Sequence, residues 1–104
     1  MLLLHLLQED DLYGYQLSQL VKQRSNSILT IPEGSMYPTL YRLLEKGYIS
    51  DYKKQVGKRL TRVYYHLEPK GKNYYLELLN NYYLVNEGIQ LLLNYKKMQE
   101  IDNE

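Results

Sequence analysis

The stretch that decides the fold is GSMYPTLYRLLEKGYI, residues 34–49. Its apolar residues recur at the spacing of one helix face, so it predicts a helix with one apolar side. Gly47 stands where a helix C-terminus favours a residue that tolerates positive φ. The helix begins either with Ser35 as its cap or near Pro32–Glu33, and Pro38 falls in the first turn only in the first case.

The other face of this helix is polar and cationic. It carries two short hydroxyls and two long cations: Ser35, Thr39, Arg42 and Lys46. Such a stripe is either a solvated surface or a surface that touches a partner.

Length and composition narrow the classes of protein. A chain of 104 residues with 44% hydrophobic residues is enough for one domain with a modest core. Cysteine is absent, which excludes a disulfide framework, a thiolate metal site and a cysteine nucleophile. The opening MLLLHLL is too short for a signal peptide or a membrane span, so we expect a helix of the fold and a cytoplasmic protein.

Positive charge is concentrated in one segment although the net charge is only +1. Between Arg42 and Lys72 there are nine basic and three acidic residues, whereas the remainder has four basic and nine acidic residues. A local excess of this kind can bind phosphates while the whole domain stays near neutral. A solvated cationic surface is the alternative.

The rest of the chain predicts helix, helix, helix, hairpin and long helix. A first helix covers residues 2–7, and Asp10 or Asp11 can cap a second helix that ends at the RSNS of residues 24–27. After the third helix come two strand-like runs, at residues 48–54 and 60–67, separated by a turn with Gly57.

The second strand has two different faces. Thr61, Val63, Tyr65 and Leu67 share the inner, apolar face, and Arg62, Tyr64 and His66 share the outer face. The hairpin is therefore expected to present cations and aromatic rings outward.

From Pro69 to about Lys97 the chain reads as one long helix. Apolar residues lie around most of the circumference of this helix, so we infer that it packs against its own domain and against a second subunit. The alternative is a helix that makes one extensive contact within its own chain. An unbroken heptad series predicts the dimerisation residues Tyr75, Leu78, Tyr82, Val85, Ile89 and Leu92.

These elements, in this order, predict an α+β, mainly α fold: a winged helix-turn-helix DNA-binding domain (residues 1–68) with a C-terminal dimerisation helix (residues 69–104). In this architecture the third helix enters the major groove of double-stranded DNA and the hairpin, or wing, lies along the backbone or in the minor groove. The groups expected at DNA are Ser35, Thr39 and Arg42 on the helix and Lys54, Lys58, Arg59 and Arg62 on the wing. A winged-helix module that binds a protein instead of DNA is the competing hypothesis.

Three segments resemble successive signatures of the PadR family of bacterial transcriptional regulators. They are YGYQL (13–17), GSMYPTLYRLLEKGYI (34–49) and RVYYHLEPKG (62–71). The resemblance implies a homodimeric DNA-binding regulator, usually a repressor, with the last helix at the dimer interface. It adds Tyr15 and Tyr37 to the residues expected at DNA and supports Ser35. A dimer in turn predicts a dyad-symmetric operator.

An enzyme is the class that the sequence favours least. His5 and His66 lack metal-ligand spacing, and there is no glycine-rich phosphate loop or nucleophile motif, so we predict no metal and no cofactor. Some PadR relatives respond to small aromatic effectors at the dimer interface. Tyr75, Tyr82 and Tyr83 are the candidates here for such a site, with core packing as the alternative role for each.

Overall fold

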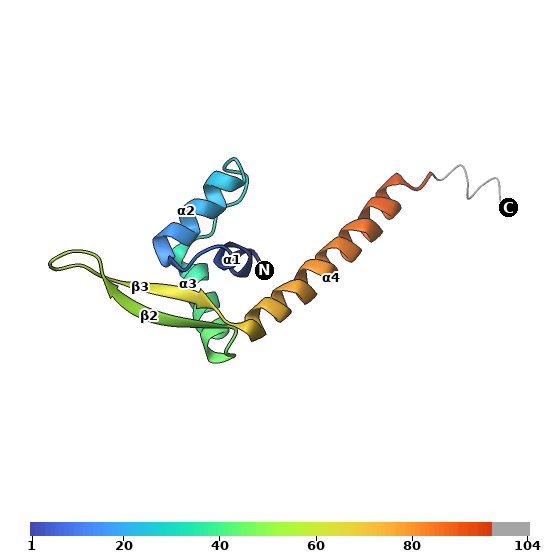
Figure 1. The fold of residues 1–104 in the computed structure, drawn as a ribbon. Helices are drawn as coiled ribbons and strands as arrows, with labels where there is room; N and C mark the ends of the chain where they lie inside the picture. Colours follow the sequence, from blue (N-terminus) through green and yellow to red (C-terminus); the bar gives the residue numbers. More distant parts are fainter. Residues whose placement is uncertain (97–104) are drawn as a thin grey trace.

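The computed structural model describes residues 1–96, and within them the chain forms a small winged domain with one projecting helix (Figure 1). The elements, in order, are α1 (Leu2–Leu7), β1 (Leu12–Tyr13), α2 (Gly14–Arg24), α3 (Glu33–Glu45), β2 (Ile49–Gln55), β3 (Thr61–Leu67) and α4 (Pro69–Asn94). The mainly helical winged fold is confirmed.

Helix α3 takes the second of the two predicted starts. Pro32 is its N-cap, so Ser35 is not a cap and Pro38 lies inside the helix, where it supplies no backbone N–H. The C-terminal prediction is confirmed: Gly47 has φ 75°, and the N–H groups of Gly47 and Tyr48 donate to the carbonyls of Leu44 and Leu43 at 3.0 Å each. This pair of hydrogen bonds is the Schellman motif, which stops the helix and turns the chain into β2.

Strand β1 was not predicted. It has only two residues, and it pairs antiparallel with β3 through Leu12 opposite Tyr65 and Tyr13 opposite Tyr64. The sheet therefore has three antiparallel strands in the order β1-β3-β2.

The predicted cap of α2 is wrong. Neither Asp10 nor Asp11 caps the helix; Tyr13 is the N-cap, and its backbone N–H donates to the side-chain oxygen of Gln16 at 3.2 Å. Because β1 precedes α2, the cap of the helix is three residues later in the chain than Asp10. Asp11 is therefore available for other contacts.

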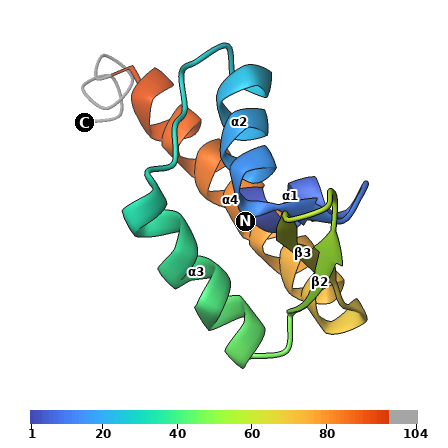
Figure 2. The ribbon, with the colours of Figure 1, turned by 90° about the vertical axis from the view of Figure 1, so that its left-hand side faces the viewer.

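The core lies between the first three helices, one face of the sheet and the start of α4. Its most completely buried side chains are Leu4, Leu17, Met36 and Leu40. Figure 2 views the molecule along the hairpin, with α2 and α3 beside it and α4 passing behind them.

Helix α4 starts against the domain and then leaves it (Figure 1). Gly71 packs against the backbone carbonyl of Tyr48 so closely that a Cβ atom would collide with it. Beyond this anchor the helix projects from the domain and ends at Asn94, three residues before the predicted end; Lys97 itself lies outside the described residues. No helix among residues 1–96 combines the length and the apolar character needed to cross a membrane.

Candidate nucleic-acid interface

The predicted cationic stripe of α3 lies on the flank that faces α1 and α4. Ser35, Thr39 and Arg42 border a hollow of about 390 Å³ that Leu2 of α1 and Tyr74 of α4 also line. Within the stripe, the Thr39 hydroxyl donates to the Ser35 carbonyl at 2.9 Å, and Arg42 donates to the Thr39 hydroxyl oxygen at 3.2 Å. Ser35 and Arg42 are exposed and Thr39 is half-buried.

The opposite flank of α3 is aromatic and faces the start of α2 and the wing. Tyr37 and Tyr41 line a groove there together with Tyr15 and Arg62. Tyr41 is 62% exposed and was not among the predicted contacts. Its helical position placed it between the core and the outer face, and only the docking of α2 and β3 shows that it borders a groove.

The residues predicted at DNA therefore fall into groups on different parts of the surface. Tyr15, Tyr37 and Arg62 converge on the groove between α2, α3 and β3, which we call the aromatic groove. Ser35, Thr39 and Arg42 form the other flank of α3. The exposed residues between the two flanks include Gly34 and Pro38.

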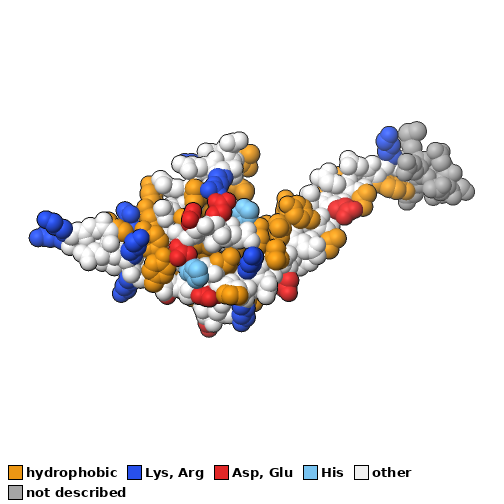
Figure 3. Space-filling model, viewed as in Figure 1, with side chains coloured by type: hydrophobic (Ala, Val, Ile, Leu, Met, Phe, Trp, Pro, Cys, Tyr) orange, Lys and Arg blue, Asp and Glu red, His pale blue; other side chains and the backbone are white. Residues whose placement is uncertain are grey.

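The wing carries the third group of predicted residues. Lys54 on β2 pairs in register with Arg62 on β3, whereas Lys58 and Arg59 lie in the loop between the strands. Lys54, Lys58 and Arg59 are exposed. Figure 3 shows the resulting concentration of Lys and Arg at the hairpin end of the molecule.

The outer face of the sheet carries cations and aromatic rings, as the sequence predicted, and three of these rings form a row across the strands. Tyr13, Tyr64 and Tyr52 lie opposite one another in register, with ring centroids 5.5 Å apart for the first pair and 5.7 Å for the second. Two wing cations lie over this row: Arg62 over the Tyr13 ring at 4.4 Å and Lys54 over the Tyr64 ring at 5.6 Å. These cation–π contacts orient long side chains that would otherwise move freely.

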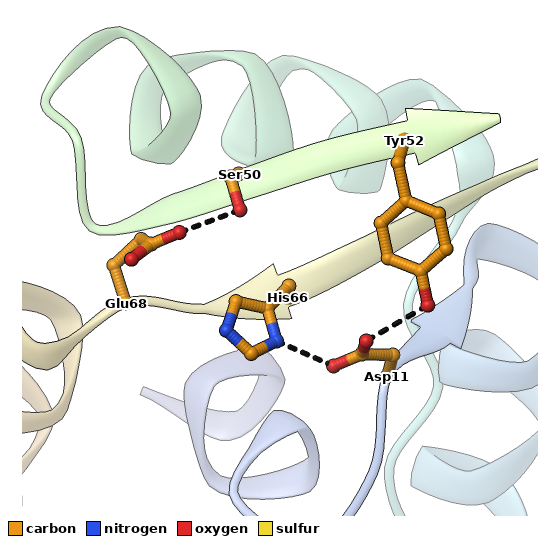
Figure 4. A network of polar contacts seen from close by, with 5 residues as sticks. All are labelled: Asp11, Ser50, Tyr52, His66 and Glu68. Carbon is orange, nitrogen blue, oxygen red and sulfur yellow. Dashed lines mark hydrogen bonds and ion pairs between the residues drawn. The ribbon is translucent and has the colours of Figure 1, made fainter.

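A carboxylate joins both strands of the wing at the end of this row (Figure 4). Oδ1 of Asp11 lies 2.7 Å from Nδ1 of His66, and Oδ2 accepts a hydrogen bond from the Tyr52 hydroxyl at 2.8 Å. Because a carboxylate only accepts, Nδ1 of His66 carries the proton. Beside this group the Ser50 hydroxyl donates to Glu68 at 2.7 Å and links β2 to the N-cap of α4.

The contacts of Asp11 shift its own pKa and the pKa values of its two partners, His66 and Tyr52. The hydrogen bond with Asp11 raises the pKa of His66, which the charges of Asp11 and Glu68 raise further against partial burial. Burial alone would raise the pKa of Asp11, but the hydrogen bonds from His66 and Tyr52 and the charge of His66 lower it. The hydrogen bond to Asp11 also raises the pKa of Tyr52.

The predicted dimerisation residues divide between core and surface. Tyr75 is only 4% exposed, and its hydroxyl lies 2.6 Å from Nδ1 of His5, so it packs inside its own domain. Leu78 is half-buried against the same core. The remaining four, Tyr82, Val85, Ile89 and Leu92, are exposed on the projecting part of α4.

The effector candidates divide in the same way. Tyr75 belongs to the core, where its ring also lies 5.6 Å from the His5 ring. Tyr82 and Tyr83 are exposed and their rings contact each other at 5.5 Å. Among residues 1–96, no group of three His, Asp or Glu side chains comes together in a way that could hold a metal ion.

Comparison with known proteins identifies this class of winged fold. A family model described as the transcriptional regulator PadR-like family matches residues 3–77. A protein of Lysinibacillus sphaericus is 35% identical over 92 residues, which are 88% of this chain and 84% of that protein. The chain therefore belongs to the PadR-like family of transcriptional regulators, and the predicted resemblance is confirmed.

Solved structures place the fold in the same family. A transcriptional regulator from Clostridium thermocellum superposes with a TM-score of 0.80 at 31% identity, over 86% of each chain. Bacillus subtilis PadR in complex with operator DNA superposes with a TM-score of 0.67 at 26% identity, over 73% of this chain and 42% of that one. Proteins of this family are transcriptional regulators and not enzymes.

Proposed function

We propose that the chain is a sequence-specific DNA-binding repressor that acts as a homodimer on a dyad-symmetric operator. The observation that carries this proposal is the convergence of Tyr15, Tyr37 and Arg62 on one groove beside α3. Hydroxyls and a guanidinium are the groups that proteins use to hold the DNA backbone in register. The operator complex of the B. subtilis relative supports DNA as the partner.

In the proposed complex, α3 enters the major groove and its two flanks have different tasks. The aromatic groove holds the phosphates on the wing side through Tyr15, Tyr37 and Arg62. Arg42, on the other flank, reaches base edges or phosphates, and its contact with Thr39 keeps the guanidinium close to the helix. Lys54, Lys58 and Arg59 bring the wing to the adjacent backbone.

The second half of the proposal is a dimer formed through α4. The projecting part of the helix exposes large apolar side chains that a monomer would leave in water: Val85 is 61% exposed and Leu92 is 77% exposed. Contiguous apolar surface of this kind marks an interaction site. A second copy of α4 would cover it and would set two α3 helices at a fixed separation, about 34 Å for half-sites one helical turn apart.

The proposal is tested by fluorescence anisotropy with the duplex immediately upstream of the coding region, a scrambled duplex and two salt concentrations. We expect tight, salt-sensitive binding that prefers the upstream duplex and that the substitutions Arg42→Ala, Lys58→Ala and Arg59→Ala together abolish. A Lys96→Ala variant, which removes a cation beyond the end of α4, is the control and should bind like the wild type.

Failure to bind any DNA at low salt would contradict the proposal. The exposed apolar surface of α4 would then favour the competing function, a winged-helix module whose partner is another protein. Loss of the wing cations would leave the activity of such a module intact.

A further inference from the structure

We propose that Asp11 is a positioning residue for the DNA-binding surface: by holding Tyr52 and His66 together, its carboxylate fixes the wing against the start of α2. This inference rests on the proposed function and assigns a role to a residue that does not itself belong to the DNA-contact groups. Asp11 lies in the short link between α1 and β1.

We call the two contacts of Asp11, with Tyr52 and with His66, the Asp11 tie. The tie is needed because β1 is only two residues long. A pair of residues is shorter than a usual strand and supplies few ladder hydrogen bonds, so additional contacts beside it contribute to its position. Asp11 supplies that help directly before β1, with one bond to β2 through Tyr52 at 2.8 Å and one to β3 through His66 at 2.7 Å. One side chain thus spans both strands of the wing (Figure 4).

Tyr13 connects the contacts of Asp11 to the proposed DNA-binding surface. Two residues after Asp11, Tyr13 pairs with Tyr64, caps α2 and carries Arg62 over its ring at 4.4 Å. Tyr15 follows in the first turn of α2 and is 59% exposed. If Asp11 releases the wing, Arg62 and Tyr15 no longer keep a fixed separation across the aromatic groove.

The charged groups around the tie determine how it responds to pH. Glu68, at the end of β3, adds to the acidic surroundings of His66, and Glu9, Asp10 and Lys72 line the same hollow. The tie is strongest when Asp11 is ionised and His66 is protonated. Above the pKa of His66 it keeps its hydrogen bonds but loses the charge pair.

The proposal predicts that removing the negative charge of Asp11 weakens DNA binding, which is the reverse of the ordinary effect. Removing a negative charge near a DNA-binding surface ordinarily strengthens binding to a polyanion. Asp11→Asn should instead weaken it, by about fivefold, since loss of the ordered wing outweighs the gain in charge. The matched control is Asp10→Asn, which removes the same charge one residue away. Asp10 is exposed and makes no side-chain hydrogen bond within residues 1–96.

The first measurement is the affinity of both variants and the wild type for the duplex that the wild type selects from a random-sequence library, at pH 6 and pH 8. We expect Asp10→Asn to bind as tightly as the wild type or more tightly, and Asp11→Asn to bind more weakly at both pH values, with the larger loss at pH 6. Asp11→Asn binding as tightly as Asp10→Asn would overturn the proposal.

The second measurement needs no DNA and separates failure of this proposal from failure of the proposed function. Amide hydrogen exchange and an NMR titration of His66 are recorded for the three proteins. We expect Asp11→Asn alone to speed exchange at β1 and its partner residues on β3 and to lower the pKa of His66 towards its ordinary value. Unchanged exchange in β1 and β3 would refute the tie, even if the chain binds DNA; faster exchange with no DNA binding in any protein would uphold the tie and refute the proposed function.

Discussion

The hydroxyl of Tyr37 on α3 lies directly over Gly14 at the start of α2, 2.5 Å from the position that a Cβ atom of residue 14 would take. Only a residue without a side chain lets the ring come this close. The contact fixes Tyr37 against the helix that carries Tyr15, and both side chains line the aromatic groove. The relative position of α2 and α3 is thereby tied to the arrangement of two residues proposed to hold DNA.

Gly14→Ala should damage DNA binding more than stability. The added methyl meets the far end of the half-buried Tyr37 side chain, which can swing outward, so we expect a loss of no more than about 1 kcal/mol in the free energy of unfolding. The displaced ring should weaken DNA affinity about tenfold. Thermal denaturation and anisotropy measure the two effects. Tyr37→Phe removes the hydroxyl, so Gly14→Ala should cost less free energy of unfolding when it is combined with Tyr37→Phe than when it is made alone. An equal cost in the two cases would show that the contact between Tyr37 and Gly14 does not affect stability.

Two glycines of α4 should respond to alanine in opposite ways. Gly71→Ala drives a Cβ atom into the backbone carbonyl of Tyr48, which cannot swing away, and we expect a loss of about 2–4 kcal/mol in the free energy of unfolding. A Cβ at Gly88 has open space around it, so Gly88→Ala should raise helix stability by up to about 1 kcal/mol. Urea denaturation of both variants tests this pair, and a Gly71→Ala protein as stable as the wild type would contradict the anchoring of α4.

Local signals were predictable from the sequence and pairings distant in the chain were not. The end of α3 at Gly47 follows from residues that lie side by side in the chain, and the hairpin follows from its own alternation. Strand β1 has no such pattern, because two residues cannot show a period and its partner on β3 is about fifty positions away. The sequence accordingly predicts Asp10 or Asp11 as the cap of α2 and gives no sign of the contacts of Asp11 with the wing.

The sequence named most of the residues proposed at DNA, with Tyr41 as an exception, but it did not predict their arrangement. A helical wheel distinguishes the outer face of α3 from its core face, but the position of α2 and β3 decides which flank meets the wing. Tyr15 and Tyr37 came from the resemblance to the PadR family, since a single tyrosine on a helix carries no functional signal of its own. Their proximity to Arg62 is a property of the fold.

The pair of Asp11 and His66 should make stability depend on pH within a defined window. The pKa of His66 is raised from 6.5, so its contribution is complete below that value and is lost as the pH rises through the folded-state pKa. The pKa of Asp11 is lowered from 3.8, so its contribution is present above that value and is lost as the pH falls through the folded-state pKa. The wild type should therefore exceed His66→Gln in stability mainly between these limits, by less than about 1 kcal/mol because both side chains are partly exposed.

Thermal denaturation of the two proteins from pH 4 to pH 9 measures this difference. The gap between them should narrow above neutral pH. A gap that widened as the pH rose would mean that neutral His66 is the stabilising form, contrary to the contact with the Asp11 carboxylate.

A charge on the exposed heptad face of α4 should abolish the proposed dimer. Val85→Glu places a carboxylate among the apolar residues of this face, where burial in an interface would leave it unpaired. We expect the variant to elute as a monomer in size-exclusion chromatography with light scattering. Asn80→Glu, an exposed position outside the heptad series on the same helix, is the control and should remain dimeric. A wild type that is monomeric at every concentration would contradict the role given to α4.

Selection of binding sites from a random-sequence duplex library is the experiment that decides whether this chain reads DNA as proposed, because it requires no knowledge of the operator. The wild-type protein should enrich an inverted repeat whose half-sites lie about one helical turn, roughly 34 Å, apart. Arg62→Ala should enrich the same repeat less strongly, since the proposed phosphate contact adds affinity without reading the bases. Enrichment of no sequence at all, at salt low enough for any basic surface to bind, would contradict the proposal that α3 and the wing form a DNA-reading surface.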